Sequence, residues 1–325
     1  MLDGGDRAVR AGGDERGAIV QRTVKSDLRF EGVGLHTGRT ARMVVRPAAA
    51  GHGIRFRRTD VAAARATIPA RWDAVEISPL CTRLVNGAGV AVSTVEHLMA
   101  ALAGTGIHDA LIEIDGPEVP ILDGSAAPFV RAFLTRGVRR LPAPVRALEI
   151  LREVRVETEA GWAALAPSAG VEMAFHIDFP DPAIGRQDLT LDLGNGAFVR
   201  ELCDARTFCR QQDVEAMRAS GLALGGSFDN AVVVDGACVL SPGGLRRADE
   251  AVRHKMLDAV GDLALAGAPI LGRYTGHRAG HALTNRLLRK LFATPGAVRT
   301  VTCDAARAAR LPGIGADLAE MPAVA

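Results

Sequence analysis

The chain has 325 residues, 48% of them hydrophobic, and a formal net charge of +2. That length allows one large domain or two of ordinary size, and the interspersed acids and bases exclude the polybasic surface typical of nucleic-acid-binding proteins. The five cysteines are widely spaced and form no C-x-x-C pair, which excludes a disulfide framework and a structural zinc knuckle and fits a reducing cytoplasm.

The chain divides by composition. Residues 1–17 are rich in Gly, Asp and Arg without an apolar run, so we expect a disordered extension rather than a signal peptide. No apolar run approaches the length of a membrane span, so no stable membrane insertion is expected. Pro142-Ala143-Pro144 is typical of a linker and separates two predicted domains, residues 18–143 and 144–305, before a tail at 306–325.

In the first half, strands precede helices. Gly-rich residues 32–38 lie between alternating, strand-like stretches, so we expect a hairpin or tight loop there. A dinucleotide-binding oxidoreductase would need a helix after these glycines, which the sequence does not offer. Ser93-Thr94 are expected to cap a helix that carries Glu96 and His97 in its first turn. Adjacent helix positions diverge by about 100°, so the two side chains cannot share one core face.

The second half repeats this order. Strand-like stretches at 148–156, 171–179 and 231–234 precede a helix with an apolar face around residues 252–263. A strand from residue 270 and a last helix opened by His281 follow. Two sets of strands followed by helices predict an α+β fold in two domains rather than a doubly wound sheet.

The helix around 252–263 carries the most informative spacing. His254 and Asp258 are one turn apart, so their side chains project together and are able to grip one metal ion. Asp262 lies one turn further along the same stripe. The alternative is an ordinary hydrogen bond on a helix surface. A metal site would require a third ligand and a base from elsewhere in the chain.

Six motifs resemble those of the UDP-3-O-acyl-N-acetylglucosamine deacetylases, the zinc amidases of lipid A biosynthesis in Gram-negative bacteria. They occur in order between residues 21 and 293, at 93–98, 114–129, 205–208, 225–230, 253–263 and 280–283. The resemblance implies two α+β domains, each a two-layer sandwich in which helices pack between two sheets, with the active site at the domain junction.

The resemblance also implies the metal ligands. They fall on His97, His254 and Asp258, three protein ligands that leave a position open for water, as a catalytic zinc requires. Iron(II) tolerates similar ligands, so Zn²⁺ is the implied cofactor and Fe²⁺ an alternative.

The implied catalytic residues surround these ligands. Glu96 matches the general base, and Thr207 matches a hydroxyl that helps to stabilise the oxyanion. His281 matches a second, cationic catalytic histidine, and Asp262 matches the acid that orients it.

The implied substrate is UDP-3-O-(3-hydroxyacyl)-N-acetylglucosamine, hydrolysed to the free amine and acetate in the committed step of lipid A biosynthesis. Residues that match substrate contacts, or are candidates to line an acyl passage within an insert of the second domain, are Lys255, Phe208, Leu35, Ala223, Leu224 and Phe228. A monomer in the cytoplasm is expected.

Three departures from the family pattern lie outside the implied ligands: His108-Asp109 after an isoleucine, Cys209 in place of a glycine, and Thr284 in place of an asparagine. Cys209 leaves the preferred acyl length open, because its side chain is able to narrow the passage. Two other functions remain open from the residues themselves: a metal-dependent amidohydrolase acting on another N-acetyl sugar, and a non-catalytic two-domain binding protein.

Overall fold

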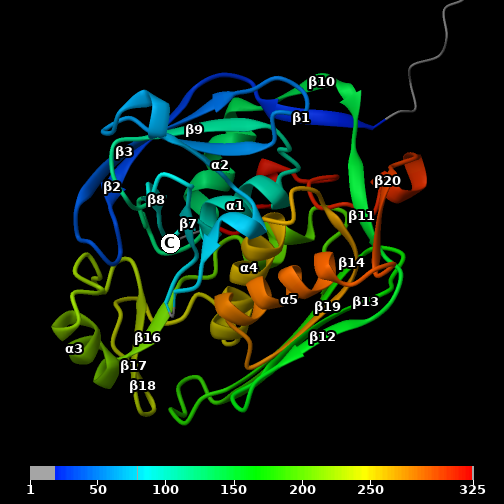
Figure 1. Ribbon diagram of the computed structural model, residues 1–325. Coiled ribbons are helices and arrows are strands. Elements are labelled where there is room, and N and C mark those ends of the chain that lie inside the picture. The colour runs from blue at the N-terminus through cyan, green and yellow to red at the C-terminus, as the bar shows by residue number, and fades with distance from the viewer. Residues whose placement is uncertain (1–18, 79, 324–325) are drawn as a thin grey trace, which may run out of the picture.

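The computed structural model describes residues 19–78 and 80–323 of the chain, so the extension predicted at residues 1–17 lies outside the described residues. The fold is mixed α+β, with several sheets and a central group of helices. Figure 1 shows α1 (Glu96–Gly104), α4 (Glu250–Ala264) and α5 (His281–Ala293) in the middle of the molecule, with one large sheet above them and another below.

The first large sheet is built only from strands of the first half of the chain. Its five strands run in the order β2 (Leu28–Val33), β3 (Thr40–Pro47), β9 (Ala110–Ile114), β4 (Ile54–Arg58) and β5 (Thr67–Pro69). The expected hairpin is confirmed, because β2 pairs antiparallel with β3 from Leu28 opposite Val45 to Val33 opposite Thr40. The alternation of β3 buries Ala41, Met43 and Val45 against the helices.

The second large sheet is built only from strands of the second half. Its path is β12 (Val154–Glu157), β13 (Trp162–Ala166), β19 (Ile270–His277), β11 (Arg146–Ile150) and β20 (Val298–Thr302), and β14 (Val171–Asp178) joins β19 to β15 (Arg186–Asp192). Strands β14 and β19 pair in parallel, and α4, the helix with the metal-ligand spacing, lies between them in the sequence.

Smaller elements complete the fold. Three small sheets are β1 (Val20–Val24) with β10 (Val138–Pro144), β6 (Val75–Glu76) with β7 (Arg83–Val85) and β8 (Ala91–Val92), and β16 (Phe208–Arg210) with β17 (Val232–Asp235) and β18 (Cys238–Val239). The other helices in the described residues are α2 (Ala127–Arg136), α3 (Gln211–Ala219) and α6 (Ala305–Ala308). Short 3₁₀ helices occur at η1 (Ala63–Arg65), η2 (Trp72–Ala74) and η4 (Leu318–Glu320), and η3 (Phe198–Leu202) is a π-helix.

Two local predictions are corrected. Pro142-Ala143-Pro144, expected as an irregular linker, forms the end of β10, where Pro144 pairs with Val20 of β1. An edge strand tolerates proline because its outward N–H groups have no partner in the sheet. Ser93-Thr94 do not cap α1; Val95 is the N-cap residue, and the Thr94 hydroxyl donates to Glu118 instead.

The helices α1 and α4 approach unusually closely. A Cβ atom added at Gly261 of α4 would lie 2.0 Å from the carbonyl oxygen of Glu96, the first residue of α1. Only glycine therefore permits this contact. It places the start of α1 directly against the stripe of His254, Asp258 and Asp262. Of the described helices, none is long and apolar enough to cross a membrane.

Candidate active site

Two helices bring the predicted metal ligands together. His97 comes from the first turn of α1, and His254 and Asp258 come from successive turns of α4. One ligand atom from each of the three lies within 4.8 Å of the others, and all three side chains are buried. The i,i+4 spacing on α4 and the close helix contact together produce a three-ligand site.

The chemistry of these donors fits a cation. The Oδ1 atom of Asp258 is buried and has no hydrogen-bond partner among the described residues. It lies 3.4 Å from the Nε2 atom of His97 and 3.3 Å from that of His254. The Nδ1 atom of His254 lies 3.0 Å from the carbonyl oxygen of Ala205, which holds the proton on Nδ1 and leaves Nε2 free for a metal.

The charge states suit metal binding. Burial lowers the pKa of His254 to about 3, so the imidazole is neutral, as a ligand must be. Burial raises the pKa of Asp258, but His254 and the Lys255 ammonium outweigh it and hold the carboxyl well below its usual range. Lys255, expected to contact substrate, places its Nζ 2.8 Å from the Oδ2 atom of Asp258.

Glu96 is held beside this group. It is only 3% exposed, and its Oε2 atom accepts a hydrogen bond of 3.0 Å from the backbone N–H of Thr82. Its Oε1 atom lies 3.8 Å from the Nε2 atom of His281. Burial raises the pKa of Glu96. Both Glu96 and His97 are buried although they are adjacent, because almost the whole circumference of α1 is covered.

The imidazole of His281 has Glu96 near its Nε2 atom and a second carboxylate, that of Asp262, at its Nδ1 atom. Its Nδ1 atom lies 2.9 Å from the Oδ2 atom of Asp262. Burial lowers the pKa of His281, but Asp262 and Glu96 outweigh it and raise the value to about 9. His281 is therefore cationic at neutral pH. The Thr82 hydroxyl donates to the Oδ1 atom of Asp262, so Thr82 contacts both acids; sequence reasoning missed it, and no motif marks it.

A second residue that sequence reasoning missed is Glu118, which is 1% exposed. Its carboxylate accepts hydrogen bonds of 2.8 Å from the backbone N–H groups of His36 and Thr37 and from the Thr94 hydroxyl. Thr94 has a positive φ of 57°, a conformation that costs a non-glycine residue about 1–3 kcal/mol. Glu118 thus ties the strained turn before Glu96 to the loop at residues 34–37.

Thr207 and Phe208 lie where the chain enters β16, and Phe208 lies beside His254 of α4. The Phe208 ring is 6.2 Å from the His254 ring, edge to face. The Thr207 backbone N–H donates to the Gly124 carbonyl at 2.8 Å. The structure records no hydrogen bond for the Thr207 hydroxyl among the described residues, so that group is available to a ligand.

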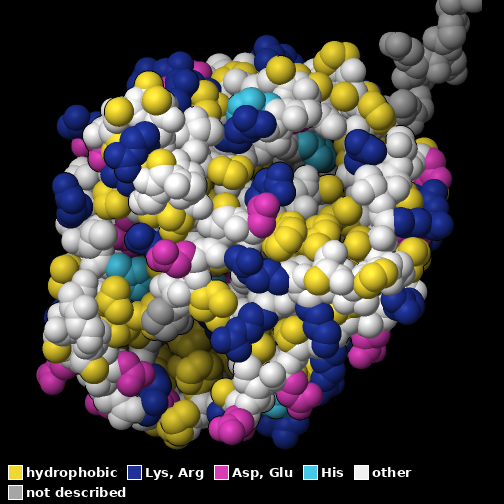
Figure 2. All heavy atoms as spheres, viewed as in Figure 1, with side chains coloured by type: hydrophobic (Ala, Val, Ile, Leu, Met, Phe, Trp, Pro, Cys, Tyr) yellow, Lys and Arg dark blue, Asp and Glu magenta, His cyan; other side chains and the backbone are white. Residues whose placement is uncertain are grey.

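The candidates for an acyl passage lie on two paired loops. The backbone N–H groups of Leu224 and Gly225 donate to the carbonyls of His36 and Leu35, at 3.1 and 3.0 Å. Ala223 is buried, whereas Leu224 and Phe228 are 54% and 46% exposed. Figure 2 shows a hollow lined by hydrophobic side chains beside the region of β16–β18, on the face shown.

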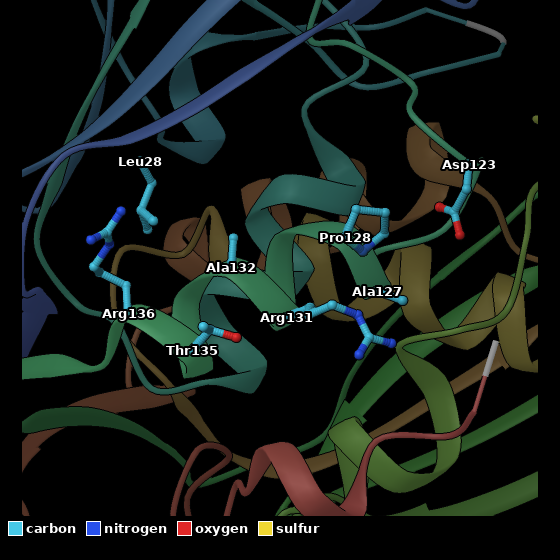
Figure 3. Close-up of a pocket in the computed structure, with 8 residues that line it drawn as sticks. All are labelled: Leu28, Asp123, Ala127, Pro128, Arg131, Ala132, Thr135 and Arg136. Atoms are coloured by element: carbon cyan, nitrogen blue, oxygen red, sulfur yellow. The ribbon is translucent and has the colours of Figure 1, made fainter.

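A large pocket lies elsewhere on the molecule. It has a volume of about 910 Å³ and is lined mainly by α2, and none of its lining residues belongs to the predicted site. Figure 3 shows Leu28, Pro128, Ala132 and Arg131 around it. A surface groove without a cluster of ligands or nucleophiles is a poor candidate for the chemistry, so we place the site at α1, α4 and α5.

Comparison with known proteins identifies clear relatives. The family described as UDP-3-O-acyl N-acetylglycosamine deacetylase matches residues 21–293. A protein named UDP-3-O-acyl-N-acetylglucosamine deacetylase from Phenylobacterium zucineum is 52% identical over 292 residues, which cover 89% of this chain and 100% of the relative. Proteins of the same name are 47% identical over 288 residues in Shewanella frigidimarina, covering 88% and 94%, and 48% identical over 286 residues in Shewanella oneidensis, covering 87% and 93%.

Proposed function

Because this chain belongs to the family of UDP-3-O-acyl-N-acetylglucosamine deacetylases, we propose that its buried cluster hydrolyses the acetamide of an acylated UDP-N-acetylglucosamine. The enzyme is a metal-dependent deacetylase of lipid A biosynthesis. The observation that carries the mechanism is the buried trio His97, His254 and Asp258, with Glu96 and His281 beside it.

The family is zinc-dependent, and His97, His254 and Asp258 would hold the ion here. When bound, zinc supplies Lewis acidity that lowers the pKa of water and polarises a carbonyl. The protein supplies the remaining roles. Neutral His254, the ionised Asp258 and the Lys255 ammonium set the charge of the pocket before substrate arrives.

Glu96 is the proposed general base. Its Oε2 atom is anchored by Thr82, so its Oε1 atom is the one available to accept a proton from the attacking water. Water adds to the acetamide carbonyl, and the oxyanion that forms lies within reach of the Thr207 hydroxyl and cationic His281 in the proposed complex. Phe208, beside the His254 ring, borders the same space.

His281 is the proposed general acid. Its Nδ1 proton is directed to Asp262, which leaves the Nε2 proton for the departing nitrogen. Transfer of that proton to nitrogen accompanies cleavage of the C–N bond and gives acetate and the free amine. Glu96, whose Oε1 atom lies 3.8 Å from this Nε2 atom, is the proposed group that returns to His281 the proton taken from water.

We further propose that residues 18–143 and 144–305 are two domains, each a two-layer sandwich with helices between two sheets. The proposal is supported by the two large sheets, each of which draws its strands from only one of these ranges. The acyl chain would lie along Leu35, Ala223, Leu224 and Phe228. We also propose a cytoplasmic location, and we propose a monomer because all proposed catalytic groups come from one chain.

The direct test is metal content and acetate release. Purified protein, offered zinc, should contain one zinc per chain and release acetate from UDP-3-O-acyl-N-acetylglucosamine. The same preparation should act far more slowly on UDP-N-acetylglucosamine without the acyl chain. Protein that binds no metal and releases no acetate after zinc is returned would favour a non-catalytic binding role.

Asp262→Asn is expected to shift the alkaline limb of the kcat profile to lower pH. Asp262 is the main group that raises the pKa of His281, and catalysis needs the protonated imidazole. The protonated form is complete below the pKa and disappears as pH rises through it, so a lower pKa ends activity at lower pH. The measurement is kcat between pH 6 and 10, with Asp235→Asn on β17 as the control; coincident alkaline limbs would refute the role of Asp262.

Leu224→Ser and Phe228→Ser are each expected to raise KM for a long-chain substrate about 10-fold with little change in kcat. That factor corresponds to about 1.4 kcal/mol, slightly less than the roughly 1.5–3 kcal/mol for fully burying a large apolar side chain. A short-chain substrate should show no change. Leu318→Ser in η4, an exposed leucine outside the loops, is the control. Equal changes in KM for the long-chain and short-chain substrates would contradict the assignment of Leu224 and Phe228 to the acyl passage.

A further inference from the structure

The metal-binding face of α4 extends one turn beyond the groups used by the proposed mechanism. Glu250, His254, Asp258 and Asp262 follow one another at four-residue intervals and so line one stripe of the helix. All four are at most 4% exposed. Among the described residues, the hydrogen bonds of Glu250, the first of them, run to Arg206 and Arg246 and not to the other members of the stripe.

Glu250 instead accepts hydrogen bonds from two neighbouring segments, one at Arg206 and one at Arg246. Its Oε1 atom accepts from the Arg206 backbone N–H at 3.0 Å and from the Arg206 Nε at 2.8 Å. Its Oε2 atom accepts from the Arg206 Nη2 at 3.0 Å and from the Arg246 backbone N–H at 2.7 Å. The result is a bidentate, buried pair of the kind that fixes orientation as well as position.

The hydrogen bond from the Arg206 backbone N–H to Glu250 connects Glu250 to the metal ligand His254. The Arg206 N–H and the Ala205 carbonyl belong to the same peptide group, which is planar and rigid. Glu250 accepts the N–H of this group, and the Nδ1–H of His254 donates to its carbonyl at 3.0 Å. Two side chains one turn apart on α4 therefore grip the two ends of a single peptide plane, so the direction of the carbonyl that meets His254 depends on Glu250.

We propose that Glu250 is a positioning residue for the metal ligand His254, acting through the peptide group between Ala205 and Arg206. By holding this plane, Glu250 keeps the Ala205 carbonyl aimed at Nδ1, which selects the tautomer of His254 whose Nε2 faces Asp258 and fixes the ring plane. The next residue, Thr207, donates its backbone N–H to the Gly124 carbonyl, so holding the Ala205–Arg206 peptide also helps to position Thr207. This inference rests on the proposed role of His254 as a metal ligand.

Two substitutions of Glu250, one that changes the charge of the side chain and one that changes its length, distinguish a positioning role from simple packing. Glu250→Gln keeps the length of the side chain and an oxygen for the Arg206 N–H. Glu250→Asp keeps the charge, but its carboxylate is withdrawn by one methylene from that N–H. Glu201→Ala is a matched control, since Glu201 pairs with Arg253 beside His254 on α4 without touching the peptide plane.

The experiment measures zinc affinity by competition with a chelator and the absorption spectrum of the Co²⁺-substituted protein, alongside thermal unfolding of each folded variant. Glu250→Asp should bind zinc about 10-fold more weakly or worse and should shift the Co²⁺ bands, in line with the loss of a group that orients a ligand. Glu250→Gln should stay within about 3-fold of wild type with unchanged bands, and so should Glu201→Ala.

Several results would overturn the proposal. Wild-type zinc affinity and Co²⁺ bands in Glu250→Asp would show that Glu250 serves packing alone, as would equal losses in Glu250→Asp and Glu250→Gln. A Glu250→Asp protein that failed to fold with zinc supplied would also assign Glu250 to folding rather than positioning. Wild-type metal binding and acetate release are measured in parallel, so a failure of the proposed function would be seen separately.

Discussion

Glu96→Ala is expected to lower kcat by about 10²- to 10⁴-fold, the usual contribution of a positioned general base, while one zinc remains bound per chain. Glu96 is buried beside the metal ligands but is not one of the trio, so its removal takes away the proton acceptor and leaves the ligands in place. KM should change little, because the loss falls on the chemical step. The measurement is steady-state acetate release with metal analysis of the same sample.

Glu96→Gln makes the test sharper. The amide retains the size of the side chain and an oxygen for the Thr82 N–H, but it cannot take a proton. Glu96→Gln should therefore be as inactive as Glu96→Ala and should be more stable to unfolding. Glu149→Gln, on β11 and paired with Arg299, controls for loss of an acid outside the site. Activity within a few fold of wild type in Glu96→Gln, or loss of zinc, would contradict a base role for Glu96.

His254→Ala is expected to abolish both zinc binding and activity. The change removes one of three protein ligands and leaves the Oδ1 atom of Asp258, already without a hydrogen-bond partner among the described residues, beside the imidazole of His97 alone. Because bound metal stabilises the folded state by mass action, by about 4 kcal/mol at a thousand times its Kd, the variant should also lose the rise in Tm that zinc gives the wild type. Metal analysis and thermal unfolding with and without zinc measure both effects.

His277→Ala is the control for His254→Ala. His277 stacks on His176 at a ring distance of 4.5 Å on strands β19 and β14, outside the metal trio. It tests whether loss of any partly buried histidine lowers zinc content. A His254→Ala protein that keeps stoichiometric zinc would require different ligands and would refute the assigned site.

Local periodicity explains why much of the fold was predictable. The helices α4 and α5 and the β2–β3 hairpin depend on neighbouring residues and were predicted from spacing and turn chemistry. The failures have equally specific causes. Pro142-Ala143-Pro144 looked irregular, but pairing with β1 decides its structure, and Thr94 looked like a cap until Glu118 provided its hydroxyl with another partner.

Within the site, the stripe of His254, Asp258 and Asp262 could be predicted from spacing alone, because a helix fixes the relation of residues four apart without any tertiary contact. The sequence also placed Glu96 and His97 at the start of a helix. That these groups meet in one site is a result of the packing of α1 against α4 and α5. The meeting depends on the close contact at Gly261, on Thr82, which reaches Asp262 across 180 residues of sequence, and on the Arg206–Glu250 pair. Such contacts leave no periodic trace in a sequence, since they are set by how separate elements pack and not by the residues beside them.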